Sequence, residues 1–125
     1  MINIDKILKI ESTLTPFGIE GSGTLQSNYK EFTSDDMNQI QTCIDWLQAK
    51  MISSQMNRIS TSYGIKHIIE RELNTYIANG CFIAAVIQLG IPYEKIPNSP
   101  NIHVAISASE LYKNDPNNVN RIVSF

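Results

Sequence analysis

Cysteine is scarce in this chain, and long apolar stretches are absent. Only two cysteines occur in 125 residues, with no C-x-x-C spacing and no histidine at metal-ligand spacing, so neither a disulfide framework nor a zinc site is expected. No apolar segment approaches the roughly 18 residues that cross a bilayer, and the first residues lack the basic and apolar pattern of a signal peptide. We therefore expect a protein of the cytoplasm.

A large excess of charge of one sign is also absent. Ten Lys and Arg residues and twelve Asp and Glu residues give a formal net charge of -2. A nonspecific polyanion binder needs a basic surface and a DNA mimic needs a dense acidic one, whereas the longest acidic run here is Asp35-Asp36. The G-x-x-x-x-G-K-S, G-x-S-x-G and H-E-x-x-H motifs are missing too. We therefore expect no enzymatic activity, no cofactor and no metal.

Hydrophobic spacing predicts a small single α+β domain that is mainly helical. Hydrophobic residues make up 42% of the chain, which suits one packed core. Apolar residues at three- and four-residue steps predict a long amphipathic helix over 34–54, capped by Thr33 or Ser34. A second helix is expected from Ser62 to near residue 74, with Lys66 among the polar residues on its outer or lateral faces.

A nearly all-apolar segment follows the second helix. Asn79-Gly80 is expected to form a turn, because both residues tolerate left-handed backbone conformations. The run 81–89 then predicts a third helix, which Gly90 ends as a C-cap. A helix without a polar face must be buried on most sides.

The last third of the chain carries the signature of a β-hairpin. Two alternating apolar segments flank the turn formers of 97–101 and predict a hairpin over 92–106. The segment 60–106 would thus contain a helix-turn-helix followed by a C-terminal hairpin. A short helix capped by Ser107 or Ser109 is expected next.

Three segments leave more than one interpretation open. Residues 2–10 fit a helix or an edge strand, with the helix favoured. Residues 13–33 are rich in Gly, Ser, Thr and Asn and predict a mobile or binding loop, with a hairpin around 20–23 as an option. Residues 121–125 either add a strand or fray.

The cysteines and the one tryptophan are expected to serve the core. Cys43 lies in the long helix and Cys81 in the apolar run, so both are expected to be buried, reduced thiols. A nucleophilic pair of Cys81 with His67 is disfavoured, because apolar surroundings raise a thiol pKa. Trp46 lies off the apolar stripe; it either extends the buried face or is exposed and forms a two-fold homodimer contact.

The densest group of polar residues lies near the start of the second helix. Ser62, Lys66 and His67 would form an anion or partner site there, and the competing interpretation is a solvated helix face with one His-Glu pair. The residues expected to contact a partner are Tyr63, Lys66, His67, Glu70, Asn98, Ser99 and Asn101, with the loop 18–23 as a further contact.

A winged-helix nucleic-acid binder is the alternative. In that motif the second helix offers polar side chains to base edges, but Gln88 is the only polar residue of the 81–89 run. Phosphate contacts would then come from Arg58, Lys66 and Arg71.

The sequence contains a pattern that consists of Ser62-Tyr63-Gly64-Ile65-Lys66-His67, then Glu70, then Tyr76 to Ala85 with its Asn79-Gly80 pair. This pattern resembles one of small proteins from phages, plasmids and their bacterial hosts. The resemblance covers roughly Ser60 to Ile106, and the pattern carries no defined activity. It implies a mobile-element context, in which short proteins often bind host machinery, anti-CRISPR and other anti-defence inhibitors among them. The expected function is therefore a non-enzymatic inhibitor or modulator of a host protein or protein complex, acting in the host cytoplasm.

Overall fold

The apolar helix forms the centre of the domain. In the computed structural model, which describes residues 2–20 and 31–113, helix α4 (Asn79–Leu89) is buried from Asn79 through Ile87. Gly90 ends it in the left-handed region, as predicted. The predicted turn at Asn79-Gly80 is wrong, because the extended Ala78 is the N-cap and both residues belong to the first helical turn.

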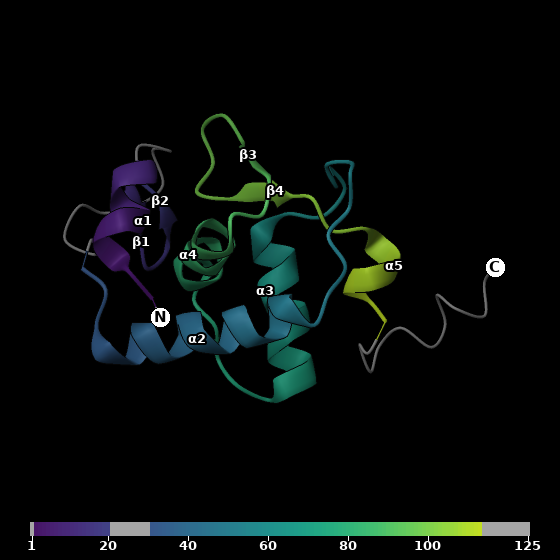
Figure 1. Cartoon of the computed structure of the whole chain (residues 1–125), viewed down its shortest axis with the longest axis horizontal. Helices are drawn as coiled ribbons and strands as arrows, with labels where there is room; N and C mark the ends of the chain where they lie inside the picture. Colours follow the sequence, from purple (N-terminus) through teal and green to yellow (C-terminus); the bar gives the residue numbers. More distant parts are fainter. Residues whose placement is uncertain (1, 21–30, 114–125) are drawn as a thin grey trace.

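Four groups of elements surround α4 (Figure 1). Helix α2 (Ser34–Gln48) crosses beneath it and helix α3 (Ser62–Leu73) packs against one side. Helix α1 (Ile4–Ile10) and the hairpin of β1 (Leu14–Thr15) and β2 (Gly18–Ile19) cover the other side. A second hairpin, β3 (Tyr93–Lys95) with β4 (Ile102–Val104), lies above it, and α5 (Ala108–Leu111) follows. The chain is thus a small, mainly helical α+β domain with two antiparallel hairpins in its described part.

Helix α2 begins as predicted and ends earlier than predicted. Thr33 and Asp36 form a capping box at its start. The expected extension to residue 54 is wrong: after Ala49 the chain leaves the helix, and its Ser53 and Asn57 amides donate to carbonyls of Ala105 and Val104. Pairing with the C-terminal hairpin therefore replaces the last helical turn.

Trp46 belongs to the core. Its side chain is buried, and its Nε1 donates to Glu72 Oε1 at 2.9 Å, which joins α2 to α3. A buried indole usually needs such a partner for its N–H group. Of the two interpretations left open for Trp46, the buried one is confirmed, and the homodimer alternative loses the exposed Trp46 on which it depended.

Helix α3 has the expected ends. Thr61 caps it, and Asn74 ends it in the left-handed region. One residue on the expected outer surface behaves differently, because Lys66 is buried with Ile65, Ile68 and Ile69.

Both ends of the described chain take definite structures. Residues 4–10 form a helix, since the Asn3 side chain accepts from the Lys6 amide as an N-cap. The expected loop is wrong over its first residues, where the β1–β2 hairpin forms. The option of a hairpin around 20–23 and the interpretations of 121–125 fall largely or wholly outside the described residues. Ser107 caps α5, one of the two residues predicted for this role.

Within the residues described, no helix is both long and apolar enough to cross a membrane.

Candidate functional site

Side chains from several separate segments enclose one pocket of about 360 Å³. We call it the Lys66 pocket. The segments are the β1–β2 turn, α3, the α3–α4 connection, the start of α4 and the β3–β4 turn. The lining residues are Phe17, Tyr63, Lys66, Tyr76, Asn79, Pro100 and Asn101.

Lys66 carries the buried charge of this pocket. Its side chain is 8% exposed, and its Nζ lies 3.3 Å from Glu70 Oε2. The same nitrogen lies 5.1 Å from the ring centroids of both Tyr63 and Tyr76. A buried ammonium is costly without compensation, and one carboxylate with two aromatic faces provides it here. Helical spacing did not predict this burial, because it depends on Tyr76, which lies beyond the end of α3, as well as on Glu70.

Glu70 holds Lys66 in place and has hydrogen-bond partners on both of its carboxylate oxygens. Its Oε2 accepts from the Ile77 amide at 3.0 Å, and its Oε1 lies 2.8 Å from His67 Nδ1. Burial acts to raise the pKa of Glu70, but the Ile77 amide, Lys66 and His67 together lower that pKa below its ordinary value. The carboxylate is therefore ionised and faces Lys66 rather than a ligand.

Asn79 joins three walls of the pocket. Its Nδ2 donates to Asn101 Oδ1 at 2.9 Å and more weakly to the carbonyls of Phe17 and Pro100, both at 3.4 Å. The Ile19 amide also donates to the Pro100 carbonyl, at 3.0 Å. The two hairpin turns and the start of α4 therefore form one connected frame.

Gly80 allows this frame to close. Its amide donates to the Pro16 carbonyl at 2.9 Å. A Cβ atom at Gly80 would overlap the carbonyl oxygen of Thr15. The glycine is thus required by the close approach of the β1–β2 turn to α4, not by a positive φ.

Three exposed aromatic side chains form the rim. Phe17 is 43% exposed, Tyr63 is 52% exposed and Tyr76 is 60% exposed. The Tyr63 ring also meets His67 edge to face, with 4.5 Å between the centroids. Phe17, Tyr76 and Asn79 were not among the predicted contacts. The last two belong to the sequence pattern described above, whereas nothing in the sequence placed Phe17 here.

The other predicted contacts lie around the pocket rather than in it. His67 and Glu70 support Lys66 and Tyr63 from behind. Asn98 is exposed and takes the left-handed φ of 59° at the β3–β4 turn. Ser99 accepts from the Asn101 amide through its Oγ at 3.1 Å, so it shapes the turn.

The cations of the nucleic-acid alternative have other contacts. Arg58 makes two hydrogen bonds to Glu94, whose hydrogen bond and charge raise the pKa of the guanidinium. Lys66 is buried beside Glu70, and Arg71 lies in the last turn of α3. The helix that would read bases, α4, is covered by its neighbours through Ile87.

The thiols have the environment of a core. Both are buried and free. Burial raises the pKa of Cys43 to about 12. Burial and the nearby Asp36 carboxylate, 3.7 Å from Cys81 Sγ, also raise the pKa of Cys81. The contacts of His67 are with Glu70 and Tyr63 and not with Cys81, the thiol with which a nucleophilic pair was disfavoured.

The fold and the pocket define a small α+β protein with an aromatic-rimmed hollow around a buried lysine. Comparison of the chain with protein-family models, curated proteins and solved structures finds no match. The described residues that line the pocket carry no thiol, imidazole or aliphatic hydroxyl group. A second hollow of about 270 Å³, between α1 and the end of α4, contains no buried charge among its lining residues.

Proposed function

We propose that this protein is a non-enzymatic binding protein that contacts a partner protein through the Lys66 pocket and its aromatic rim. In the mobile-element context that the sequence pattern implies, the partner is a host protein or complex that is inhibited or modulated. The proposal treats Tyr63 and Lys66 as direct contacts and His67 and Glu70 as their supports.

The rim is the observation that carries this proposal. Three large aromatic side chains remain exposed around one concave site, although each has enough apolar surface to favour burial. Tyrosine is among the residues that contribute most to protein–protein binding, especially around a central pocket. An exposed aromatic cluster of this kind favours a protein partner over a solvated surface.

The frame beneath the rim supports the same function. Asn79 fixes the two hairpin turns, and Glu70 fixes Lys66, so the pocket is formed before any partner arrives. A preorganised surface loses little conformational freedom on binding, which leaves more of the contact energy as affinity.

Capture from an extract of a bacterial host, with crosslinking and quantitative mass spectrometry, tests the proposal. Phe17→Ala and Tyr76→Ala each remove an exposed ring. Because a hot-spot contact contributes about 2 kcal/mol or more, we expect each variant to lose about thirtyfold of the specific partner signal.

Ile59→Ala is the matched control, because Ile59 is an exposed apolar side chain in the connection between α2 and α3 and does not line the pocket. Capture by this variant should equal that of the unmodified protein. The proposal is wrong if both rim variants still capture the same proteins at the same level. A steep salt dependence of binding to mixed-sequence DNA would instead support the nucleic-acid alternative.

A further inference from the structure

The hydrogen-bonding capacity that is still available in the Lys66 pocket consists mainly of donors. An ammonium has three N–H groups, and Glu70 is the only hydrogen-bond acceptor that Lys66 Nζ has among the described residues. Asn101 accepts from Asn79 through its Oδ1, and neither N–H group of its own amide has an acceptor among the residues that the structure describes. Within the described chain, the hydroxyls of Tyr63 and Tyr76 make no hydrogen bond either.

Apart from the hydroxyl oxygens of Tyr63 and Tyr76, which can donate as well as accept, the acceptors of the site already have partners or are out of reach. The carbonyls of Phe17 and Pro100 and the Oδ1 of Asn101 accept from Asn79. Glu70 accepts on both oxygens. Asn79 Oδ1 has no partner in the described part of the chain, but it is fully buried and therefore closed to a ligand. A ligand that satisfies this pocket must bring acceptor atoms.

Building on the proposed function, we propose that the Lys66 pocket binds a carboxylate group of the partner protein. Lys66 Nζ is the ionic contact, Asn101 Nδ2 is a second donor, and the rings of Phe17, Tyr63 and Tyr76 contact the apolar part that carries the carboxylate. The carboxylate comes from an acidic side chain or from a chain terminus, since both present the same two oxygens.

The charge balance favours a carboxylate over a phosphate. A phosphate carries about -1.5 to -2 charges and is usually held by several cations or by an arginine cluster. The pocket has one ammonium, and Glu70 lies 3.3 Å from it. One partly compensated cation matches a monoanion better than a dianion. Burial strengthens the contact, because hydrogen bonds to charged groups are stronger where water is excluded.

A titration with small probes, followed by NMR of the aromatic rings and side-chain amides, tests this inference. Phenylacetate carries a carboxylate on an aromatic stem, and phenylacetamide has the same shape without the charge. On the unmodified protein we expect phenylacetate to bind about tenfold more tightly or better, because charge-assisted hydrogen bonds are roughly twice as strong as neutral ones. Signals of Tyr63, Tyr76 and Asn101 should shift.

The double variant Lys66→Met/Glu70→Gln removes both charges together, so no carboxylate is left unpaired. It should bind phenylacetate only as weakly as phenylacetamide. Lys50→Met is the matched control, since Lys50 is also buried and also lies on an aromatic ring but does not line the pocket. The affinity of this variant for phenylacetate should equal that of the unmodified protein. The comparison of the two probes on the unmodified protein decides the question even if the double variant does not fold.

Further probes identify the source of the anion. An aromatic dipeptide with a free C-terminal carboxylate is compared with an amidated dipeptide that has an acidic side chain. Tighter binding of the first would assign the carboxylate to a chain terminus, and tighter binding of the second would assign it to an acidic side chain. Equal binding of phenylacetate and phenylacetamide would overturn the inference. So would tighter binding of phenyl phosphate than of phenylacetate, which would assign a phosphate ligand.

The two proposals fail in different ways. If phenylacetate and phenylacetamide bind equally but Tyr76→Ala still loses the captured partner, the rim binds a partner and the inference of a carboxylate ligand is wrong. If phenylacetate binds as expected but the rim variants capture normally, the pocket chemistry stands and the proposed function is wrong.

Discussion

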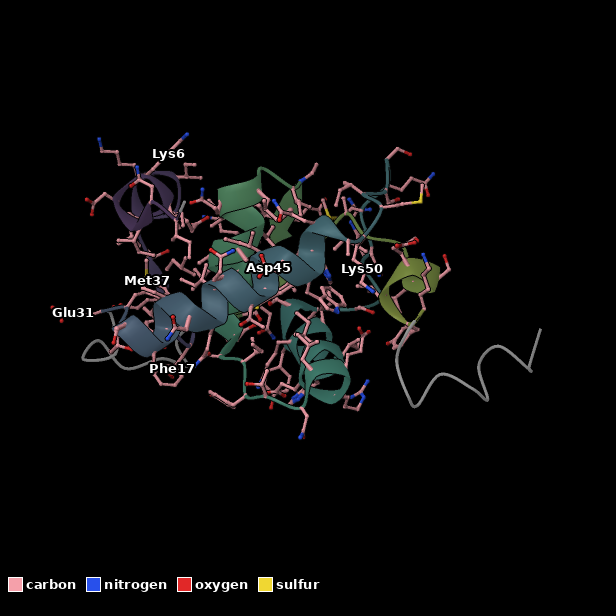
Figure 2. The ribbon with its side chains drawn as sticks, turned by 60° about the horizontal axis from the view of Figure 1, so that its bottom comes forward. Lys6, Phe17, Glu31, Met37, Asp45 and Lys50 are labelled. Carbon is pink, nitrogen blue, oxygen red and sulfur yellow. The ribbon has the colours of Figure 1, made fainter. Side chains whose placement is uncertain are left out.

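Two buried lysines among the described residues face aromatic rings, and their surroundings differ. Lys50 is 9% exposed and lies just beyond the end of α2, with its Nζ 4.4 Å from the Trp46 ring centroid. Lys66 is 6% exposed and lies between two tyrosine rings with Glu70 at its Nζ. Figure 2 shows Lys50 at the opposite end of α2 from Phe17, which lines the Lys66 pocket.

This difference is the reason why we propose Lys66, and not Lys50, as the lysine that contacts a partner. Lys50 follows a helix C-terminus, where a cation is favoured by the helix dipole, and its ammonium lies over the ring of the core residue Trp46. Lys66 lies in the middle of α3, where no such advantage exists, and it is held by a carboxylate in a pocket with unused donors. The proposal for Lys66 therefore rests on its position in a donor-rich pocket and not on burial alone, which Lys50 shares.

The largest loss of stability is expected when the frame of the Lys66 pocket is disturbed. Gly80→Ala places a methyl group against the Thr15 carbonyl and the Pro16 backbone, neither of which can rotate away. Overpacking against backbone is expected to cost about 3 kcal/mol of the free energy of unfolding, measured by urea denaturation.

Gly64→Ala is its matched control within a helix. Outside the neighbouring backbone of its own helix, a Cβ atom at Gly64 meets no described atom within 4 Å. Because alanine favours the helix, this variant should be more stable by roughly 0.5–1 kcal/mol. Similar losses in both variants would contradict the packing of the β1–β2 turn against α4.

The lysines themselves come next in size. Lys66→Met leaves Glu70 without its ammonium, and we expect a loss of about 2 kcal/mol because the Ile77 amide and His67 still compensate part of the carboxylate charge. Lys50→Met removes a cation–π contact and a favourable interaction with the helix dipole but leaves no charge unpaired, and it should cost about 1 kcal/mol or less.

Adding Glu70→Gln to Lys66→Met sharpens this result. The double variant no longer contains an unpaired carboxylate, so at least half of the lost stability should return. Thermal and urea unfolding of the four proteins gives the comparison. If Lys50→Met is as damaging as Lys66→Met, the two environments are energetically alike and the distinction between them is wrong.

The parts of the fold that the sequence predicted are those set by local signals, and the parts it missed depend on contacts between distant segments. Helix α3, the apolar α4 and the β3–β4 hairpin follow from local signals: the Thr61 cap, an apolar run ended by Gly90, and turn formers between alternating strands. The end of α2 was missed, since Ser53 and Asn57 bond to a hairpin fifty residues away in the chain. Periodicity does not record such competition.

The pocket was predicted only in part for a related reason. Tyr63, Lys66 and Asn101 were expected contacts, because polar and aromatic residues gather near a helix start and at a hairpin turn. The burial of Lys66 depends on Tyr76, which lies beyond the end of its helix. Phe17 reaches the pocket through a hairpin in a segment that was expected to be a loop. Contacts between segments of different type therefore escaped the sequence patterns.

The smallest expected effect is the acid dependence of stability that Glu70 confers. Its pKa is held below the ordinary value of 4.5, so the unfolded chain takes up a proton at this residue more readily than the native protein does. The stabilising contribution is complete above about pH 5 and is lost as the pH falls through the native pKa. Glu70→Gln should therefore show a shallower loss of stability between about pH 5 and pH 3 than the unmodified protein.

Salt distinguishes this effect from that of a surface pair. The pKa of Glu94 is also lowered, chiefly by its hydrogen bond from Arg58, but both groups are exposed. Screening at about 0.5 M salt should remove most of the contribution of Glu94. The contribution of Glu70 should persist, because its carboxylate is largely buried and fixed by the Ile77 amide. Lys50→Met should leave the acid limb unchanged. The stability differences that Glu70→Gln and Glu94→Gln cause are compared at low and high salt. If both differences respond equally to salt, the Lys66 pocket is as hydrated as the surface. Lys66 would then lose the property that separates it from an ordinary solvated lysine.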